Sequence, residues 1–335
     1  GVLIHPSYAQ DYSWAIALGS TGEDWGKVIA TDASGNVYVG GEFRGTADFD
    51  PSSSTANLTS AGHTDIFIAK YNSSGEYQWV IGLGGTGNYW DYIDGLAVDN
   101  SGNLYVAGYN GSTIDFDPSS NTANVTGTMY IAKYNSSGEY QWAYGFGKGR
   151  IQYFDFDGSG NIYIAGELDY GQTHDFDPSS NTVTLTVAGS SNTDAFFAKY
   201  NSAGEYQWAK NIGGTGEDDA FWISVDGSGN VYVKGYFNGT ADFDPSSNTA
   251  NLTAVGGKDM FFAKYNSSGE YQWAYNIGTS QDEYAYFAGI DTDASGNVYL
   301  SGQLLVYSVN GVVMSSMDFN FSSSVDTLVK PGGTS

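Results

Sequence analysis

Four loops of this chain place two aspartates one residue apart, an arrangement whose carboxylates could hold a metal ion. Each loop reads Asp-Phe-Asp-Pro-Ser-Ser, and the aspartates are Asp48 and Asp50, Asp115 and Asp117, Asp175 and Asp177, and Asp242 and Asp244. Oxygen ligands at alternate positions are typical of Ca²⁺ loops, so these residues are candidate calcium ligands and Ca²⁺ is the candidate cofactor. Proline and serine replace the glycine turn of an EF-hand, which excludes that particular site. The alternative is that each aspartate caps its own turn through backbone amides.

Large rings beside acidic loops offer a second kind of chemistry, the binding of sugars. Pockets of this kind combine an apolar surface with a few placed polar groups, here carboxylates and amides that would bond hydroxyls. The alternative is that the rings only pack between sheets, where aromatic side chains supply much of the buried area. Large rings of this kind are expected at corresponding positions in all five units of the repeat described below. The candidate sugar-binding residues are Trp25, Trp90, Tyr153, Trp222 and Tyr286.

Acidic residues also precede the first strand of several units, at Glu23–Asp24, Glu217–Asp219 and Asp282–Glu283. Paired carboxylates hydrolyse glycosides when one acts as an acid and the other as a base in a different environment. Because these acids recur with the repeat, we interpret them as a solvated rim and predict no enzyme. No serine, histidine and aspartate outside the repeat form the pattern of a catalytic triad.

Composition excludes several classes of protein. The 335 residues include 37 acidic and 12 basic side chains, which gives a formal net charge of -25. A nucleic-acid-binding protein needs a cationic surface, and an anionic membrane surface would repel this chain. There is no cysteine for disulfides or thiolate sites, and no apolar run is long enough to span a membrane. We therefore expect neither nucleic acid as a partner nor membrane insertion.

Recurring sequence markers define the organisation of the chain. The aromatic marker Tyr-Gln-Trp, which reads Tyr-Ser-Trp in its first copy, recurs every 63 to 66 residues and ends at Trp14, Trp79, Trp142, Trp208 and Trp273. A second marker, Gly-Asn followed by an aliphatic residue and tyrosine, begins at Gly35, Gly102, Gly160, Gly229 and Gly296. Ala-Lys-Tyr-Asn and the Asp-Phe-Asp-Pro loops keep a similar spacing. The chain therefore consists of five units of about 65 residues.

Each unit contains four short apolar segments separated by Asp, Ser, Gly and Asn, the pattern of strands joined by tight turns. In the first unit these segments are 28–32, 37–39, 66–70 and 76–81, with a further short strand expected at 56–59. The second segment carries large apolar groups on both faces, as a sheet packed between two others requires. The sequence predicts an all-β fold, a five-bladed β-propeller with four-stranded blades.

The two ends of the chain predict how this propeller closes. The fifth unit stops at Ser335, where its third strand should begin. Residues 1–19 supply the missing third and fourth strands, and would complete the last blade of a single domain, 1–335, in the same molecule or in a neighbouring subunit. The residues expected to mediate this assembly are Val2, Leu3, Ile4, Tyr12 and Trp14. The alternative is that residues 1–9 are the tail of a secretion signal.

The unit resembles the bacterial SBBP-type β-propeller repeat. Residues 32–43 and 226–237 match its pattern Asp-x-Ser-Gly-Asn-Val-Tyr-Val-x-Gly-x-Phe, and residues 65–70 and 259–264 match its later Asp-x-Phe-x-Ala-Lys. The resemblance covers nearly the whole chain, except for 303–317 in the fifth unit. It implies an extracellular or cell-surface setting and no particular reaction.

We therefore expect a secreted, non-enzymatic structural or adhesive surface protein that associates with itself or with other surface proteins. Strand donation through the split blade would let it assemble into fibres. The alternative is a multivalent carbohydrate-binding lectin with repeated sites on one rim, whose partners would be glycans.

Overall fold

The computed structural model of the chain describes residues 14–20, 22–87, 90–171, 174–188, 192–278, 282, 289–292 and 298–300, and four two-residue strands near the C-terminus. Those strands are β25 (Ser308–Val309), β26 (Val312–Val313), β27 (Met317–Asp318) and β28 (Thr327–Leu328). Every regular element in the described residues is a β-strand. The same residues contain no helix that is long and apolar enough to cross a membrane. The predicted all-β fold is confirmed.

Four antiparallel sheets of four strands follow one another along the chain. Sheet 1 has the order β1 (Trp25–Thr31), β2 (Val37–Phe43), β5 (Asp65–Tyr71) and β6 (Tyr77–Leu83). Sheet 2 has β7 (Asp91–Val98), β8 (Leu104–Asn110), β11 (Met129–Tyr134) and β12 (Tyr140–Phe146). Sheet 3 has β13 (Gly149–Phe156), β14 (Ile162–Leu168), β17 (Asp194–Tyr200) and β18 (Tyr206–Gly214). Sheet 4 has β19 (Asp219–Val225), β20 (Val231–Asp242), β21 (Asn251–Tyr265) and β22 (Tyr271–Ile277).

Short hairpins extend the sheets between their second and third strands. They are β3 (Thr46–Asp48) with β4 (Asn57–Thr59), β9 (Ile114–Asp115) with β10 (Asn124–Val125), and β15 (His174–Asp175) with β16 (Thr184–Leu185). In sheet 4 the same extension is continuous with β20 and β21, and the end of β18 pairs with it, which links sheets 3 and 4. A further strand pair, β23 (Ile290–Thr292) and β24 (Val298–Leu300), follows sheet 4.

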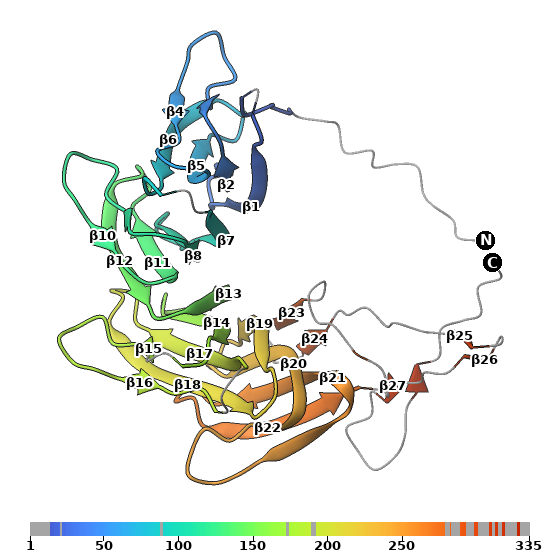
Figure 1. The fold of residues 1–335 in the computed structure, drawn as a ribbon. Coiled ribbons are helices and arrows are strands. Elements are labelled where there is room, and N and C mark those ends of the chain that lie inside the picture. Colours follow the sequence, from blue (N-terminus) through green and yellow to red (C-terminus); the bar gives the residue numbers. More distant parts are fainter. Residues whose placement is uncertain are drawn as a thin grey trace.

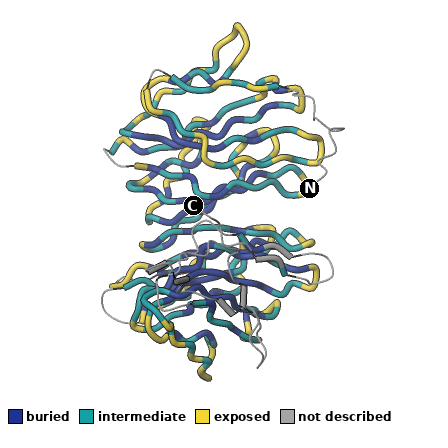
Figure 2. Tube along the Cα trace, turned by 90° about the vertical axis from the view of Figure 1, so that its right-hand side faces the viewer, coloured by how far each residue is buried: buried dark blue, intermediate teal, exposed yellow. Residues whose placement is uncertain are grey.

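The sheets stand side by side in an arc with their first strands on the inner side (Figure 1). The first strand of each sheet contacts the first strand of the next, from β1 to β7, β13 and β19, and β19 contacts β23. Buried residues run through the middle of the strands, and exposed residues gather at the turns (Figure 2). This radial order of four-stranded sheets is the arrangement found in β-propellers.

The core lies between neighbouring sheets. One buried cluster joins Ile68 of sheet 1 to Ile93 and Val106 of sheet 2, and another joins Phe197 of sheet 3 to Ile223 of sheet 4. The middle strands are buried on both faces, as the apolar residues on both sides of these strands predicted. At about 25 cal/mol per Å² of apolar area, this burial is the main source of stability.

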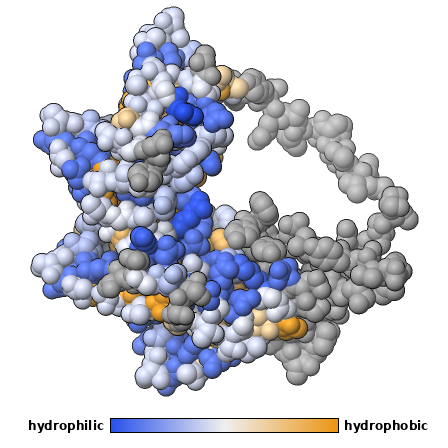
Figure 3. Space-filling view, viewed as in Figure 1, coloured by the Kyte–Doolittle hydropathy of each residue, from blue (hydrophilic) through white to orange (hydrophobic). Residues whose placement is uncertain are grey.

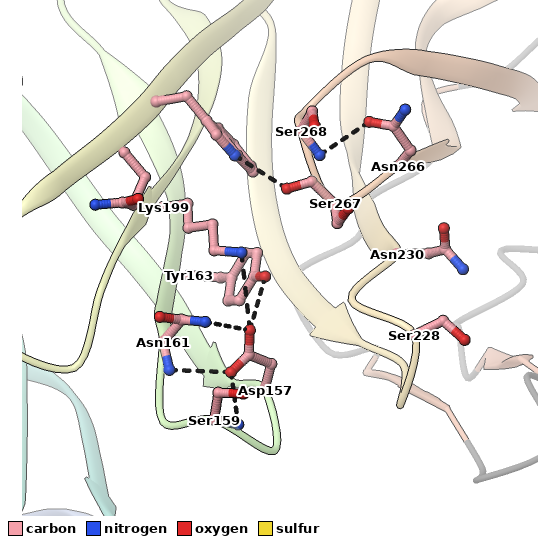
Figure 4. Close-up of polar contacts among 12 residues, drawn as sticks. Asp157, Ser159, Asn161, Tyr163, Lys199, Ser228, Asn230, Asn266, Ser267 and Ser268 are labelled. Carbon is pink, nitrogen blue, oxygen red and sulfur yellow. Dashed lines mark hydrogen bonds and ion pairs between the residues drawn. The ribbon is translucent and has the colours of Figure 1, made fainter.

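The turn between the first two strands of each sheet is built by an aspartate. In sheet 3, Asp157 Oδ1 accepts hydrogen bonds from the amides of Ser159 and Asn161, at 2.9 and 3.0 Å. The Tyr163 hydroxyl donates to its other oxygen at 3.1 Å, and Lys199 Nζ lies 3.8 Å from that oxygen (Figure 4). The Asp-x-Ser-Gly-Asn sequence therefore has a structural role, because its aspartate satisfies the turn amides.

A tryptophan on the outer strand of each of sheets 1 to 3 packs on the last turn of the next sheet. Trp79, Trp142 and Trp208 contact the turn glycines Gly138, Gly204 and Gly269 so closely that a Cβ there would lie 2.8 to 3.2 Å from the indole. Two of these indoles also donate to the turn: Trp79 Nε1 to Ser136 O at 3.3 Å and Trp208 Nε1 to Ser267 O at 3.2 Å. This repeated contact sets the spacing between sheets.

Candidate functional site

The paired aspartates of the Asp-Phe-Asp-Pro loops bond backbone amides of their own loops. Asp115 Oδ1 accepts from the amides of Asp117 and Ala123 at 3.1 and 2.7 Å, and Asp117 Oδ1 accepts from Ser119 N at 2.9 Å. The same contacts recur in the loops that carry Asp48 and Asp50, Asp175 and Asp177, and Asp242 and Asp244. In the described residues, no group of three or more His, Asp and Glu side chains could hold a metal ion. These contacts are the ones expected if each aspartate caps its own turn through backbone amides.

Chelation separates the two interpretations of these loops. We expect excess EDTA to leave the melting temperature unchanged, because backbone amides already occupy the Oδ1 atoms of both Asp115 and Asp117. We expect Asp115→Ala to cost about 1–3 kcal/mol in the free energy of unfolding, because it leaves two partly buried amides without an acceptor. Thermal melts with EDTA and with added CaCl₂ measure both effects. A clear drop in melting temperature with EDTA would instead favour calcium.

The aromatic candidates for sugar binding fall into two separate pairs. The rings of Trp25 and Trp90 lie 5.7 Å apart at the junction of sheets 1 and 2. The rings of Tyr153 and Trp222 lie 4.1 Å apart at the junction of sheets 3 and 4. Tyr286 lies outside the described residues.

The expectation that these rings occupy corresponding positions in every unit is wrong for the described sheets. Trp25 is paired with Glu42, whereas Tyr153 is paired with Ala165, three residues further along the first strand. Each first strand contains a register shift between these two positions. Because of this shift, the spacing of residues along the sequence does not predict which residue of the second strand each ring is paired with. Trp222 follows the shift in β19, as Tyr153 does in β13.

One edge of the sheets carries different residues in each unit. It is formed where each first strand begins and each second strand ends, and we call it the variable edge. Its facing residues are Trp25 and Glu42 in sheet 1, Tyr92 and Tyr109 in sheet 2, Arg150 and Glu167 in sheet 3, and Asp219 and Tyr236 in sheet 4. Because the rest of the unit repeats closely, we take these positions as the candidate functional site.

Aromatic residues line the variable edge where sheets 1 and 2 meet. Trp90, which is 38% exposed, stacks on Tyr92 with ring centroids 5.9 Å apart and an interplanar angle of 11°. The His63 ring lies 4.9 Å from Trp90, and Tyr109 lies 6.1 Å from Tyr92. Trp90 is therefore an exposed ring held in place by its neighbours.

Charged residues continue the edge toward sheet 3. The Arg150 guanidinium donates two hydrogen bonds to Asp94, with Nε 2.9 Å from Oδ2, and these bonds raise the pKa of Arg150. On sheet 1, Lys27 Nζ lies 3.5 Å from Glu42 Oε2, and burial raises the pKa of the Glu42 carboxyl. The charges along this edge thus largely offset one another.

Two carboxyl groups from different sheets meet at the variable edge. Glu167 of β14 is hydrogen-bonded to Asp219 of β19, and Thr193 Oγ1 donates to Asp219 Oδ1 at 2.7 Å. Burial, and then the neighbouring Asp219, raise the pKa of Glu167 to about 8. The Glu167 carboxyl therefore stays protonated at neutral pH, and its O–H donates a hydrogen bond to Asp219. Sequence reasoning missed this pair, because the two residues come from different units. Comparing the units position by position along the variable edge could have found it.

A hollow of about 470 Å³ opens between the aromatic and the charged parts of the edge. Hydrophilic residues gather along the inner side of the arc (Figure 3). The hollow is lined by Trp90, Tyr92, Tyr109, Gly111, Gly149, Arg150, Glu167 and Asp169. Its size falls within the range of about 300–1,000 Å³ that is usual for small-molecule sites.

Comparisons with known proteins point to one class of fold. The chain is 28% identical over 263 residues to the uncharacterized WD repeat-containing protein L264 of Acanthamoeba polyphaga mimivirus, an alignment that covers 67% of this chain and 19% of that protein. It is 25% identical over 277 residues to the regulatory protein FlaEY of Caulobacter vibrioides, covering 75% of this chain and 27% of that protein. The chain thus spans about a fifth to a quarter of the length of the curated relatives it matches.

The mimivirus relative is a WD repeat-containing protein, and the radial order of the four-stranded sheets of this chain is consistent with the β-propeller fold of such repeats. No family model matches the chain, and the resemblance to SBBP-type repeats therefore has no support from a family model. Among solved structures, a protein of unknown function from Bacteroides caccae aligns with a TM-score of 0.29 and 10% identity, covering 76% of this chain and 82% of that one.

Proposed function

We propose that the chain is a secreted, non-enzymatic structural or adhesive protein whose five blades are completed by its own N-terminal segment or by that of a neighbouring copy. The observation that carries the completion of the last blade is the place of residues 14–19. Trp14 Nε1 donates to Ser73 O at 3.0 Å, and a Cβ at Gly75 would lie 2.7 Å from the indole. Trp79 and Trp208 make the same contacts from outer strands of complete sheets.

A second contact supports the same placement. Gly19 forms an antiparallel bridge with Asp48, as Gly213 of β18 does with Asp242. Both glycines come five residues after their tryptophan. Residues 14–19 therefore lie beside sheet 1 as the outer strand of a preceding sheet lies beside the next. Val2, Leu3, Ile4 and Tyr12, the other residues expected to complete that sheet, lie outside the described residues.

The strands after sheet 4 fit the remaining half of such a blade. β23 contacts β19 as the first strand of each sheet contacts the first strand of the previous sheet, and β24 pairs with β23. One further blade, shared between these strands and the N-terminal segment, makes five. The alternative of a multivalent lectin needs an equivalent site in every unit, and the two registers of the aromatic candidates provide none across sheets 1 to 4.

Strand donation between copies is tested by removing residues 1–9. We expect the full chain to form polymers, and the shortened chain to give soluble monomers, because the donated third strand is lost. Light scattering coupled to size-exclusion chromatography measures the mass, and negative-stain images distinguish fibres from discs. Polymers that survive the deletion would reject strand donation, and a full chain that forms only discs would place closure within one molecule.

A further inference from the structure

The hollow at the variable edge combines features that the repeat does not explain. The facing positions beside it are Tyr92 and Tyr109 in sheet 2, and Arg150 and Glu167 in sheet 3. A structural repeat has no need of different residues at equivalent positions, whereas a single ligand bound across two sheets does. The hollow is therefore a candidate site for one ligand in each molecule, distinct from the assembly surface around Trp14.

Trp90 provides the apolar side of this hollow. Its ring is one of the few large hydrophobic side chains exposed in the described residues, at 38%. Tyr92 stacks on it, and Trp25 and His63 lie 5.7 and 4.9 Å away, so little conformational entropy is left to lose on binding. A flat, exposed and immobilised ring suits a ligand with an apolar face of similar size.

Polar groups line the opposite side. Arg150 is held by Asp94 while 42% of its side chain stays exposed, so guanidinium hydrogens remain available to a ligand. Glu167 and Asp169 add carboxyl groups, and Gly111 and Gly149 bring the backbone close to the hollow. Burial raises the pKa of Glu167 to about 8, so at neutral pH this carboxyl adds no negative charge to the hollow.

The charge balance limits the class of ligand. The Arg150 charge is offset by Asp94, Asp169 also faces the hollow, and the whole chain carries a formal charge of -25. An anionic ligand would meet a repulsive field. A hydroxyl-rich uncharged molecule can use the remaining donors and acceptors without that cost.

We propose that this hollow binds an uncharged saccharide, with one pyranose ring packed against the exposed part of Trp90 and its hydroxyls bonded to Arg150, Glu167 and Asp169. Within the described residues the site is single, and it is formed between sheets 2 and 3. It serves recognition of a glycan surface, and it is independent of strand donation at the N-terminus.

The test is calorimetric titration at pH 7 with uncharged hexaoses of glucose, mannose and galactose, and with a hexauronate for comparison. We expect at least one neutral hexaose to bind with a dissociation constant below about 1 mM. Trp90→Ala should weaken binding at least tenfold, and Trp90→Phe should retain most of it. Ile29→Ala, which removes another exposed apolar side chain at 69% exposure, is the control and should change nothing.

Several outcomes would overturn the proposal. They are the absence of binding by every neutral hexaose at about 10 mM, unchanged binding by Trp90→Ala, or tighter binding of the hexauronate. If Trp90→Ala does not fold, as circular dichroism would show, the comparison of Trp90→Phe and Arg150→Gln with the native chain decides. Repeating the titration with the chain lacking residues 1–9 separates the two proposals, because binding should persist there without polymers. Shortening of a bound hexaose would support the site and reject the non-enzymatic function.

Discussion

The melting temperature of this protein is expected to fall by about 5–10 °C when the pH rises from about 5.5 to about 8.5. The cause is a set of buried carboxyl groups that stay protonated in the folded state. Burial is the largest cause of the raised pKa of each: about 6 for Asp91 and Asp194, about 7 for Asp218 and about 8 for Glu167. The first three are at most 2% exposed.

The direction of the effect follows from proton binding. In the unfolded chain these carboxyls ionise near pH 4. Between pH 4 and the raised pKa values the folded state binds more protons, so its stability decreases as the pH rises. Each unit of upward shift costs about 1.4 kcal/mol once the pH has passed both values. The loss should therefore be complete near pH 8.5, above the pKa of Glu167.

A variant isolates the group that titrates last. Glu167→Gln keeps a donor toward Asp219 and removes the ionisation, so the slope of melting temperature against pH should flatten between about pH 7 and 8.5. Glu76→Gln removes an exposed carboxylate from a turn and should keep the native slope. Thermal melts in about 0.5 M NaCl screen repulsion between surface charges, so a pH dependence that vanishes in salt would contradict the role of the buried groups.

The second large effect concerns the contact of the N-terminal segment. Trp14→Ala is expected to destabilise the chain by about 2–4 kcal/mol, about as much as Trp208→Ala, because both indoles pack on a turn glycine and donate to a serine carbonyl. Trp14→Phe should recover the packing and lose only the hydrogen bond, about 1 kcal/mol. Urea unfolding of the three variants measures these differences.

The comparison with Trp208 is what makes this result informative. If residues 14–19 only rest on sheet 1, Trp14→Ala should act as a surface substitution, within about 0.5 kcal/mol of the native chain, while Trp208→Ala still costs several times more. Such a difference would contradict the split blade. Equal costs would indicate that the N-terminal segment belongs to the cooperative fold.

Much of each sheet could be predicted from sequence because its signals are local. The segments 37–39 and 66–70 fall inside β2 and β5, and the short strand expected at 56–59 is β4. Their ends are set by turn residues such as Asp32 and Gly35, whose roles are intrinsic to the residue types.

The candidate site was less predictable because its geometry is non-local. The register shift in each first strand decides whether a ring such as Tyr153 faces the variable edge or the neighbouring sheet. None of the recurring sequence markers predicts the position of this shift. The meeting of Glu167 and Asp219 depends on how two sheets pack, which spacing within one unit cannot report. Trp90 was identified from its residue type, and only its exposure distinguishes it from rings such as Trp222 that pack between sheets.

The tryptophan contact between sheets has a consequence for how such chains change length. Each of sheets 1 to 4 offers one glycine turn to the indole that precedes it, and sheets 1 to 3 each give one indole to the next sheet, so each of these junctions has a donor side and an acceptor side. Gene duplication of a whole unit would reproduce both sides at once and need no new complementary surface. The number of units can therefore change by whole units during evolution. The curvature of the ring of sheets, rather than the chemistry of the contacts between them, then determines which numbers of units give a stable fold.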